Sequence, residues 1–320
     1  MMIKDLNDTK IKFARLAYSA SWNLGDHIQT LATERFLGCN PINIERDKLS
    51  QYEGEKVILL MQGYFFVNEL HCSFPPSSNI IPVFTGFHIE DSHETRSFYS
   101  SVNIIEYLRK YAPIGCRDES TMKFLENNEI EAYFTRCLTL TFPCRDKNIK
   151  GGKIFFIDEP EWLKPSRFTG KKFKKIYESA HFLTQVVDEK IAILSDEEKR
   201  LLAIDRIELL KNEAKLVVTS RLHIAAPCIA MGIPVVLIPR TATPVRYEAI
   251  KGLIPMYDFP VKCFSKYHRK LTYKIRRAVQ VVYIRFLINW NPIPPNIEKL
   301  KSQIIANVNE AINKSLNECL

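Results

Sequence analysis

Two hydrophobic patterns alternate along the first 142 residues of the chain. Short, almost continuous apolar runs predict strands, and segments with apolar residues three or four positions apart predict helices. We expect strands at 11–20, 41–45, 56–61, 80–87, 112–116 and 131–142, and helices at 26–37, 95–111 and 118–128. Such a regular alternation is typical of a layered α/β domain.

The pattern breaks once and then starts again. Residues 143–152, PCRDKNIKGG, combine Pro, Gly and charge, which indicates a domain boundary. After it we expect strands at 153–158, 179–185, 215–220 and 233–239, with helices at 196–214 and from 221 onward. The run VVLI has the continuous apolarity of a central parallel strand. The sequence therefore predicts two Rossmann-like, doubly wound α/β domains, residues 1–147 and 148–320, facing each other across a cleft.

The composition agrees with a folded globular protein, since 46% of the 320 residues are hydrophobic. No run of about 18 apolar residues occurs, and the N-terminus lacks a signal-peptide pattern. We therefore expect the chain in the cytoplasm. Its eight cysteines show no CxxC pair and no His at metal-ligand spacing, so we expect reduced thiols, mostly in the core, and no metal site.

The net charge of +9 is concentrated in two segments. Residues 164–175 hold six Lys or Arg and residues 262–290 hold eight, without any acid, which leaves 31 basic against 36 acidic residues elsewhere. Aromatic residues are interleaved with the second segment, which suits it to an anionic membrane surface at the inner face of the membrane. A solvated helix whose aromatics pack on the second domain is the alternative. The acidic remainder of the chain argues against nucleic acid as a partner. A last amphipathic helix is expected at 297–316.

Ligands of open α/β sheets bind beyond the carboxyl ends of the strands, so polar strand-to-helix joints are candidate sites. The first such joint is SASWNLGDHIQTLA, where Gly25 permits a tight turn and Asp26 can cap the following helix. An ordinary capped turn is the alternative. The joint contains neither GxGxxG nor GxxxxGK[ST], so it is not a dinucleotide fingerprint or a Walker A loop.

A second joint, APIGCRDES, delivers Arg117 and Asp118 to the start of a helix. Asp118 is expected as the cap, but an Arg at a helix N-terminus opposes the helix dipole and asks for an anionic partner. That partner is either a carboxylate, Asp118 or Glu119, or an anionic ligand. His88 ends another strand, and a role in function requires that it face the same cleft.

The third joint is TSRLHIAAPCIAMGIPVV, in which Ser220 is a good N-cap and Arg221 and His223 fall in the first helical turn. Two cations beside free backbone N–H groups favour an anionic ligand. Pro227 cannot donate to the carbonyl of His223, so we expect a kink at the His. The alternative is a core His with an Arg paired to a nearby carboxylate.

These motifs, WNLGD, RDE and TSRLH followed by GIPVV, resemble in their order and spacing the polysaccharide pyruvyl transferase family over about residues 13–240. The resemblance implies a fold similar to the two-domain GT-B glycosyltransferases. It also implies transfer of the pyruvyl group of phosphoenolpyruvate to a sugar of a surface glycan or its lipid-linked precursor, forming a ketal and releasing phosphate. The positions that match the donor-binding part of the family motifs are Arg221, Arg117, Leu222, Ser220, Asn23 and Gly25.

The chemistry implied by the resemblance needs an acid and a base. His223 is the candidate acid that protonates the enol methylene, and His88 or Asp26 is the candidate base that takes the sugar hydroxyl proton. Phosphoenolpyruvate acts as a substrate, so no cofactor is implied. The alternative enzyme is a GT-B glycosyltransferase whose nucleotide-sugar diphosphate would suit the same helix end. The acceptor sugar stays open.

Overall fold

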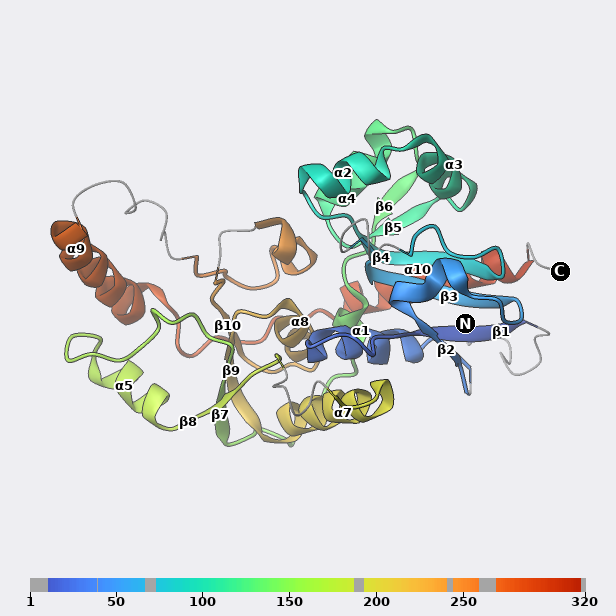
Figure 1. Ribbon diagram of the computed structural model, residues 1–320. Coiled ribbons are helices and arrows are strands. Elements are labelled where there is room, and N and C mark those ends of the chain that lie inside the picture. The colour runs from blue at the N-terminus through green and yellow to red at the C-terminus, as the bar shows by residue number, and fades with distance from the viewer. Residues whose placement is uncertain are drawn as a thin grey trace.

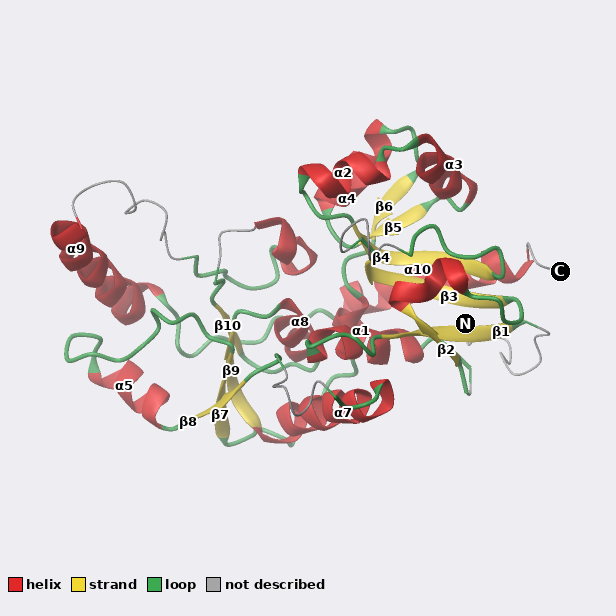
Figure 2. Ribbon diagram, viewed as in Figure 1, coloured by secondary structure: helices red, strands yellow, loops and turns green. Residues whose placement is uncertain are grey.

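The computed structural model describes residues 11–38, 40–66, 73–186, 193–240, 244–258 and 269–317, and it contains two parallel β-sheets covered by helices (Figures 1 and 2). The strand order is β2-β1-β3-β4-β5-β6 in the first sheet and β10-β9-β7-β8 in the second. The prediction of a Rossmann-like α/β fold is confirmed. The division into two domains of GT-B type stays a prediction.

The first sheet and its helices follow the predicted order closely. Its strands are β1 Lys12–Ala17, β2 Ile42–Glu45, β3 Val57–Tyr64, β4 Ile80–His88, β5 Ile114–Cys116 and β6 Ala132–Phe134. Its helices are α1 Leu24–Glu34, α2 His93–Tyr99, α3 Val102–Lys110 and α4 Glu119–Asn127, and a 3-10 segment, η2, spans Arg46–Gln51. The central strands β3 and β4 are buried along most of their length, in keeping with their continuous apolar sequences.

Two predictions in this half were wrong in extent. The single helix expected at 95–111 is two helices, because Ser101 adopts an extended conformation and begins α3 after α2 has ended. The strand expected at 131–142 ends at Phe134, since Arg136 turns the chain with a φ of 64°. The remaining apolar residues form a 3-10 segment, η4 Leu138–Thr141, that is fully buried.

The second sheet is smaller. Its strands are β7 Lys153–Ile157, β8 Ala180–Leu183, β9 Ala214–Thr219 and β10 Val235–Leu237. The helices are α5 Lys171–Glu178, α7 Asp196–Glu213, α8 Leu222–Ala230, α9 Arg269–Val282 and α10 Glu298–Asn317, with a 3-10 segment η5 at Pro244–Ile250 and a π-helical turn at Tyr283–Leu287. Neither α5 nor η5 was predicted from the sequence.

One hydrophobic cluster joins the two sheets. It contains Ile58 and Leu60 of β3 together with Val217 of β9 and Ile224 of α8. The C-terminal helix α10 belongs to this cluster through Ile304 and packs against β4 of the first sheet (Figure 1). The chain thus returns to its first half at its end.

A cluster of ion pairs connects β1 and α1 to α7. Glu34 of α1 accepts hydrogen bonds from Arg15 and, at 2.6 Å, from Nη2 of Arg200, while Glu197 lies 2.8 Å from Nη2 of Arg15. Asp196, in the first turn of α7, accepts a hydrogen bond of 2.7 Å from the backbone N–H of Tyr18, the residue after β1. These contacts hold the joint after β1 beside the second sheet.

Within the described ranges, no helix is long and apolar enough to cross a membrane. The four cysteines described there are free thiols, and three of them, Cys116, Cys137 and Cys228, are buried. Cys144 is exposed. Of the aromatic residues interleaved with the basic segment 262–290, Phe264 and Tyr267 lie outside the described residues, and the side chain of Tyr273 is not described.

Candidate functional site

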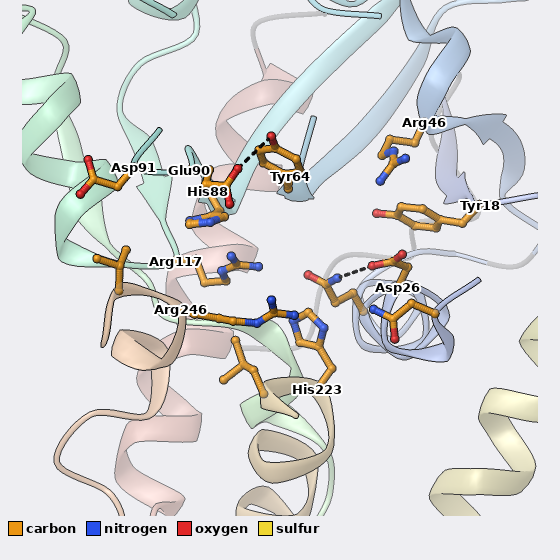
Figure 3. A pocket seen from close by; sticks show the side chains of 14 residues that line it. Tyr18, Asp26, Arg46, Tyr64, His88, Glu90, Asp91, Arg117, His223 and Arg246 are labelled. Carbon is orange, nitrogen blue, oxygen red and sulfur yellow. Dashed lines mark hydrogen bonds between the residues drawn. The ribbon is translucent and has the colours of Figure 1, made fainter. Parts of the chain in front are cut away.

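A pocket of about 580 Å³ opens at the carboxyl ends of the first sheet (Figure 3). Five of its side chains lie at or directly after the ends of β1 to β5, namely Tyr18, Arg46, Tyr64, His88 and Arg117. The first turn of α8 and the segment η5 close the pocket from the other side (Figure 3). Its remaining lining residues are Asn23, Asp26, Gln29, Glu90, Asp91, Leu222, His223, Val245 and Arg246. This is where the topology of an open α/β sheet leads one to expect a ligand, and the volume suits a small molecule.

The first polar joint enters the pocket through α1. Asn23, not Asp26, is the N-cap, and its Oδ1 accepts the N–H of Gly25 at 3.1 Å. The prediction of Asp26 as cap was wrong because the strand ends at Ala17 and the helix begins at Leu24, which puts Asp26 in the first turn. There its carboxylate accepts from the hydroxyl of Ser21 at 2.5 Å and faces the pocket.

Gly25 does not line the pocket, but it lets α1 approach His223 closely. A Cβ at this position would lie 3.2 Å from Nδ1 of His223 and 3.1 Å from Oδ1 of Asn23. Both distances are shorter than ordinary van der Waals contact with carbon. The N–H of Leu24 also donates to the carbonyl of Gln185 beyond β8 at 2.9 Å. The absence of a side chain at Gly25 therefore allows the two halves of the site to meet.

His88 and Asp118 form a buried pair at the ends of β4 and β5. Nδ1 of His88 lies 2.5 Å from Oδ2 of Asp118, while Oδ1 of Asp118 caps α4 by accepting the N–H of Thr121 at 2.8 Å. Burial lowers the pKa of His88 to about 4, and the positive charge of Arg117 adds to the effect. Burial alone would raise the carboxyl pKa of Asp118, but the interaction with His88, the positive charge of Arg117 and the hydrogen bond from Thr121 outweigh it and keep that pKa below the usual value. The pair is thus a neutral imidazole beside a carboxylate, with Nε2 left for a ligand.

Arg117 lines the pocket and forms no ion pair with an acid in the part of the chain that the structure describes. Of its two expected partners, Asp118 binds His88, and Glu119 lies 3.6 Å from Lys251. Burial lowers the pKa of Arg117. The geometry leaves this guanidinium available to an anionic ligand.

Arg221 and Ser220 are placed differently from the prediction. Arg221, not Ser220, is the N-cap residue of α8, and no side chain caps this helix. The hydroxyl of Ser220 instead donates to the carbonyl of Asp158 at 2.5 Å, and Nε of Arg221 lies 2.7 Å from the Asp158 carboxylate. Neither residue lines the pocket. The alternative of an Arg paired to a nearby carboxylate describes the observed position of Arg221.

His223 lies in the pocket at a break in α8. Its ψ of 16° departs from helical geometry, so the predicted kink is confirmed at the residue four positions before Pro227. Among the described residues Nε2 of His223 is buried without a hydrogen-bond partner. Burial lowers the pKa of His223 well below its usual value, and the charges of Arg117 and Arg246 act in the same direction. An unpartnered, buried ring nitrogen among cations is unfavourable unless a ligand supplies an acceptor or negative charge.

Arg246 was missed by the sequence reasoning. It is an exposed residue of η5 that lines the pocket beside Arg117 (Figure 3). Its neighbours hold the segment in place, since the Tyr247 hydroxyl donates to the Ser220 carbonyl at 2.7 Å and Glu248 accepts the N–H of Ser120 at 3.2 Å. The hydrogen bonds of Tyr247 and Glu248 thus hold η5 so that the guanidinium of Arg246 lies in the pocket.

Arg46, Tyr18 and Tyr64 were also missed. The guanidinium of Arg46 lies over the Tyr18 ring at 5.2 Å, with its Nε 2.7 Å from Asp47. The Tyr64 hydroxyl donates to Glu90 at 3.4 Å (Figure 3). Each of these three residues is at or just past the end of a strand, which is the signal that identifies them.

Within the described ranges no group of three or more His, Cys, Asp or Glu side chains is arranged to hold a metal ion. The pocket instead combines three guanidiniums, from Arg46, Arg117 and Arg246, with two imidazoles and the carboxylates on its walls. Such a set is suited to binding a small molecule with more than one anionic group and to moving protons on it.

The chain is similar to known proteins in two comparisons. Among the solved structures, the chain is similar to an uncharacterised protein from Klebsiella pneumoniae, with 17% identity, a TM-score of 0.42, and coverage of 74% of this chain and 87% of that one. No curated protein matches the chain. The family model described as polysaccharide pyruvyl transferase matches residues 23–241, which include Asn23, Gly25 and Asp26 after β1 and the joints after β5 and β9. The chain belongs to the polysaccharide pyruvyl transferase family.

Proposed function

We propose that the protein transfers the pyruvyl group of phosphoenolpyruvate to two hydroxyls of one sugar, in a surface glycan or its lipid-linked precursor. The products are a cyclic ketal and phosphate. The observation that carries the proposal is the unpartnered Nε2 of His223 in a pocket lined by Arg117 and Arg246. Phosphoenolpyruvate supplies the carboxylate and the phosphate that such a pocket requires.

Donor binding is assigned to the positive side of the pocket. Arg117 and Arg246 neutralise the phosphate and carboxylate, and the uncapped start of α8 at Leu222 and His223 offers backbone N–H groups to one of them. Arg221 stays a candidate donor ligand through its Nη atoms, because among the described residues its ion pair with Asp158 uses Nε. Asn23 holds the first turn of α1 against the same ligand.

Protonation of the donor is assigned to His223. The imidazole is neutral before the donor binds, because burial and neighbouring cations lower its pKa. A bound dianionic or trianionic donor reverses that charge balance and raises the pKa of the ring. His223 then gives a proton to the methylene carbon, whose new C–H bond uses the electron pair of the C=C bond, and the adjacent carbon becomes oxocarbenium-like.

Attack by the acceptor is assigned to His88, at the strand end next to that of Arg117, and to Asp26 on α1. A sugar hydroxyl adds to the cationic carbon while Nε2 of His88 takes its proton, with Asp118 holding the ring in the required tautomer. The C–O bond to phosphate then breaks, and phosphate leaves with the electron pair. A second hydroxyl of the same sugar closes the ketal, and Asp26 is positioned to take its proton. One of the two hydroxyl protons restores His223 and the other leaves with phosphate.

The test is incubation of the purified protein with phosphoenolpyruvate and a panel of sugars, oligosaccharides and lipid-linked sugars. We expect phosphate release that depends on the acceptor, with a matching mass gain and a ketal signal by NMR. Parallel incubations with nucleotide sugars test the glycosyltransferase alternative. Nucleotide release without phosphate release from phosphoenolpyruvate would overturn the proposal.

A further inference from the structure

The two basic segments of the sequence meet at one end of the molecule. Residues 167–173, which lead into α5, line a surface groove of about 570 Å³ together with Ile284, Arg285, Phe286 and Trp290, which follow α9. A Cβ on Gly170 would lie 3.6 Å from Cγ of Arg285, so the segments are in close contact. Figure 1 shows α5 and α9 at the end of the molecule opposite to the first sheet. We refer to residues 164–178 and 275–290 together as the basic lobe.

The inner side of the basic lobe is anchored to the second sheet. Ile284 and Trp290 are buried in a cluster with Phe156 of β7 and Phe173 of α5. The indole N–H of Trp290 donates to the carbonyl of Ile284 at 2.8 Å, and Gln280 donates to the carbonyl of Trp162. These contacts decide which side of α9 faces outward.

The outer side of the basic lobe is apolar as well as basic. Ile275 and Val282 lie two turns apart on one face of α9, and Phe286 continues that face in the π-helical turn. Phe286 is 67% exposed, and Phe168 on the other segment is 56% exposed. Each of these rings lies beneath a guanidinium, Arg285 at 5.0 Å and Arg167 at 4.6 Å. Exposed aromatic and aliphatic residues beside Arg are typical of a helix that lies in a membrane interface.

The positive charge of the basic lobe indicates that its partner surface is anionic. Residues 164–178 and 275–290 contain nine basic residues and one acid, Glu178, whose carboxylate lies 3.7 Å from Nζ of Lys174. A second copy of the lobe would be repelled by like charge. Nucleic acid would satisfy the charges but offers no apolar layer for Ile275, Val282 and Phe286. An anionic bilayer satisfies both requirements.

We propose that the basic lobe docks the protein onto the surface of an anionic lipid bilayer, with Phe168 and Phe286 inserted among the headgroups. The exposed Arg276 and Arg285 hold lipid phosphates beside them. This proposal goes beyond pyruvyl transfer and does not depend on it, because none of these four residues lines the site pocket.

The test is co-sedimentation of the full chain with phosphatidylcholine vesicles and with vesicles that contain phosphatidylglycerol. We expect strong binding only to the anionic vesicles, and weaker binding in high salt. Arg276→Glu with Arg285→Glu should reduce the affinity about 30-fold or more. Phe168→Ser with Phe286→Ser should reduce it about tenfold or more.

Matched controls carry the same changes elsewhere. Lys123 on α4 and Lys215 on β9 are exposed, so Lys123→Glu with Lys215→Glu alters net charge equally, and Val102→Ser removes another exposed apolar residue. These variants should bind anionic vesicles as the parent does. Equal binding to neutral vesicles, equal losses in the controls, or binding to RNA but not to vesicles would overturn the proposal.

Phosphate release with a soluble acceptor separates this proposal from the proposed function. The lobe variants should retain the parent rate, because the pocket is unchanged. A parent protein that binds anionic vesicles but releases no phosphate from phosphoenolpyruvate would contradict the proposed function alone.

Discussion

Nδ1 of His88 lies 2.5 Å from Oδ2 of Asp118, and the other oxygen of the same carboxylate caps α4. One carboxylate therefore fixes both the start of a helix and the tautomer of an imidazole. Because the helix fixes the direction of the carboxylate, the ring of His88 is held with Nε2 as its free nitrogen. The relationship makes Asp118 a positioning residue for a candidate base.

Replacing Asp118 with Asn should separate these two roles. Asn is as good an N-cap as Asp, so α4 and the folded state should be retained. The amide no longer stabilises the imidazolium that forms when His88 takes a proton, and we expect kcat to fall about 100-fold or more, while KM for phosphoenolpyruvate changes little. Steady-state phosphate release and thermal unfolding provide the two measurements.

His88→Gln serves as the control for this prediction. If Asp118 acts through His88, the double variant should be no slower than His88→Gln alone. A further loss in the double variant, or an unchanged kcat in Asp118→Asn, would contradict the assigned role.

The strand-to-helix joints could be predicted from the sequence because strands buried in a parallel sheet are almost continuous apolar runs. The side chains that pair with the residues of those joints could not be predicted. Arg221 appeared to be an anion ligand at a helix end, but Asp158, which follows a strand 63 residues earlier, binds it. This ion pair forms because β7 and β9 are adjacent strands of the second sheet. Local hydrophobic periodicity predicts each strand but not which strands are adjacent.

Arg246 shows a second limit of the sequence. It lies in a 3-10 segment with no apolar period, after β10, where no motif marks it. Its position depends on Tyr247 and Glu248 reaching Ser220 and Ser120, both distant in the sequence. Arg46 and Tyr64 were easier to predict. Ligands of open α/β sheets bind at the carboxyl ends of the strands, and a search at the end of every predicted strand would have identified both residues.

Arg246→Ala should weaken donor binding without affecting stability. The side chain is exposed and forms no ion pair within the described residues, so its removal leaves no buried charge. Losing one charged hydrogen-bonding partner of an anion should raise KM for phosphoenolpyruvate about tenfold or more. Kinetics at varied donor concentration and a thermal unfolding scan check both parts.

Arg221→Ala is the matched comparison. It leaves the buried Asp158 carboxylate without its closest guanidinium, so we expect a loss of roughly 3 kcal/mol in the free energy of unfolding. Adding Asp158→Asn should restore much of that stability. A raised KM that persists in the restored double variant would show that Arg221 also contacts the donor, and a normal KM would remove it from the donor site.

Donor binding should be accompanied by proton uptake at His223. The ring, which is neutral before the donor binds, acquires a favourable anionic neighbour when phosphoenolpyruvate binds, so its pKa rises and it takes up a proton near neutral pH. Calorimetric titrations in buffers of different ionisation enthalpy measure the number of protons bound. The parent should take up more protons than His223→Gln, and equal numbers would rule out the assignment of His223 as the acid.

Stability should fall on mild acidification because buried histidines resist protonation. Burial lowers the pKa of His27 and of His88 to about 4, below the ordinary value of 6.5. The unfolded chain therefore binds more protons between pH 6.5 and 4, and stability present above that range is lost as the pH falls through it, by about 3 kcal/mol for each ring. Urea unfolding at several pH values should show this slope.

His27 offers a control outside the pocket for that prediction. It is buried on α1, with Nδ1 3.6 Å from Asp196 and Nε2 without a partner among the described residues. His27→Gln should make the loss between pH 6.5 and 4 about 3 kcal/mol smaller. A variant with the same pH slope as the parent would contradict the buried, neutral state of His27.

Gly25→Ala should impair activity while leaving the fold stable. Ala is a better helix former than Gly, and the position requires no positive φ, so α1 itself gains from the change. The new methyl group would lie 3.2 Å from Nδ1 of His223, however, and must displace the ring or the helix by a few tenths of an ångström. Since proton delivery depends on the position of that ring, we expect kcat to fall about tenfold with an unchanged or higher Tm. A fall in Tm with normal kcat would instead mean that Gly25 serves packing and that the contact between α1 and His223 has no part in catalysis.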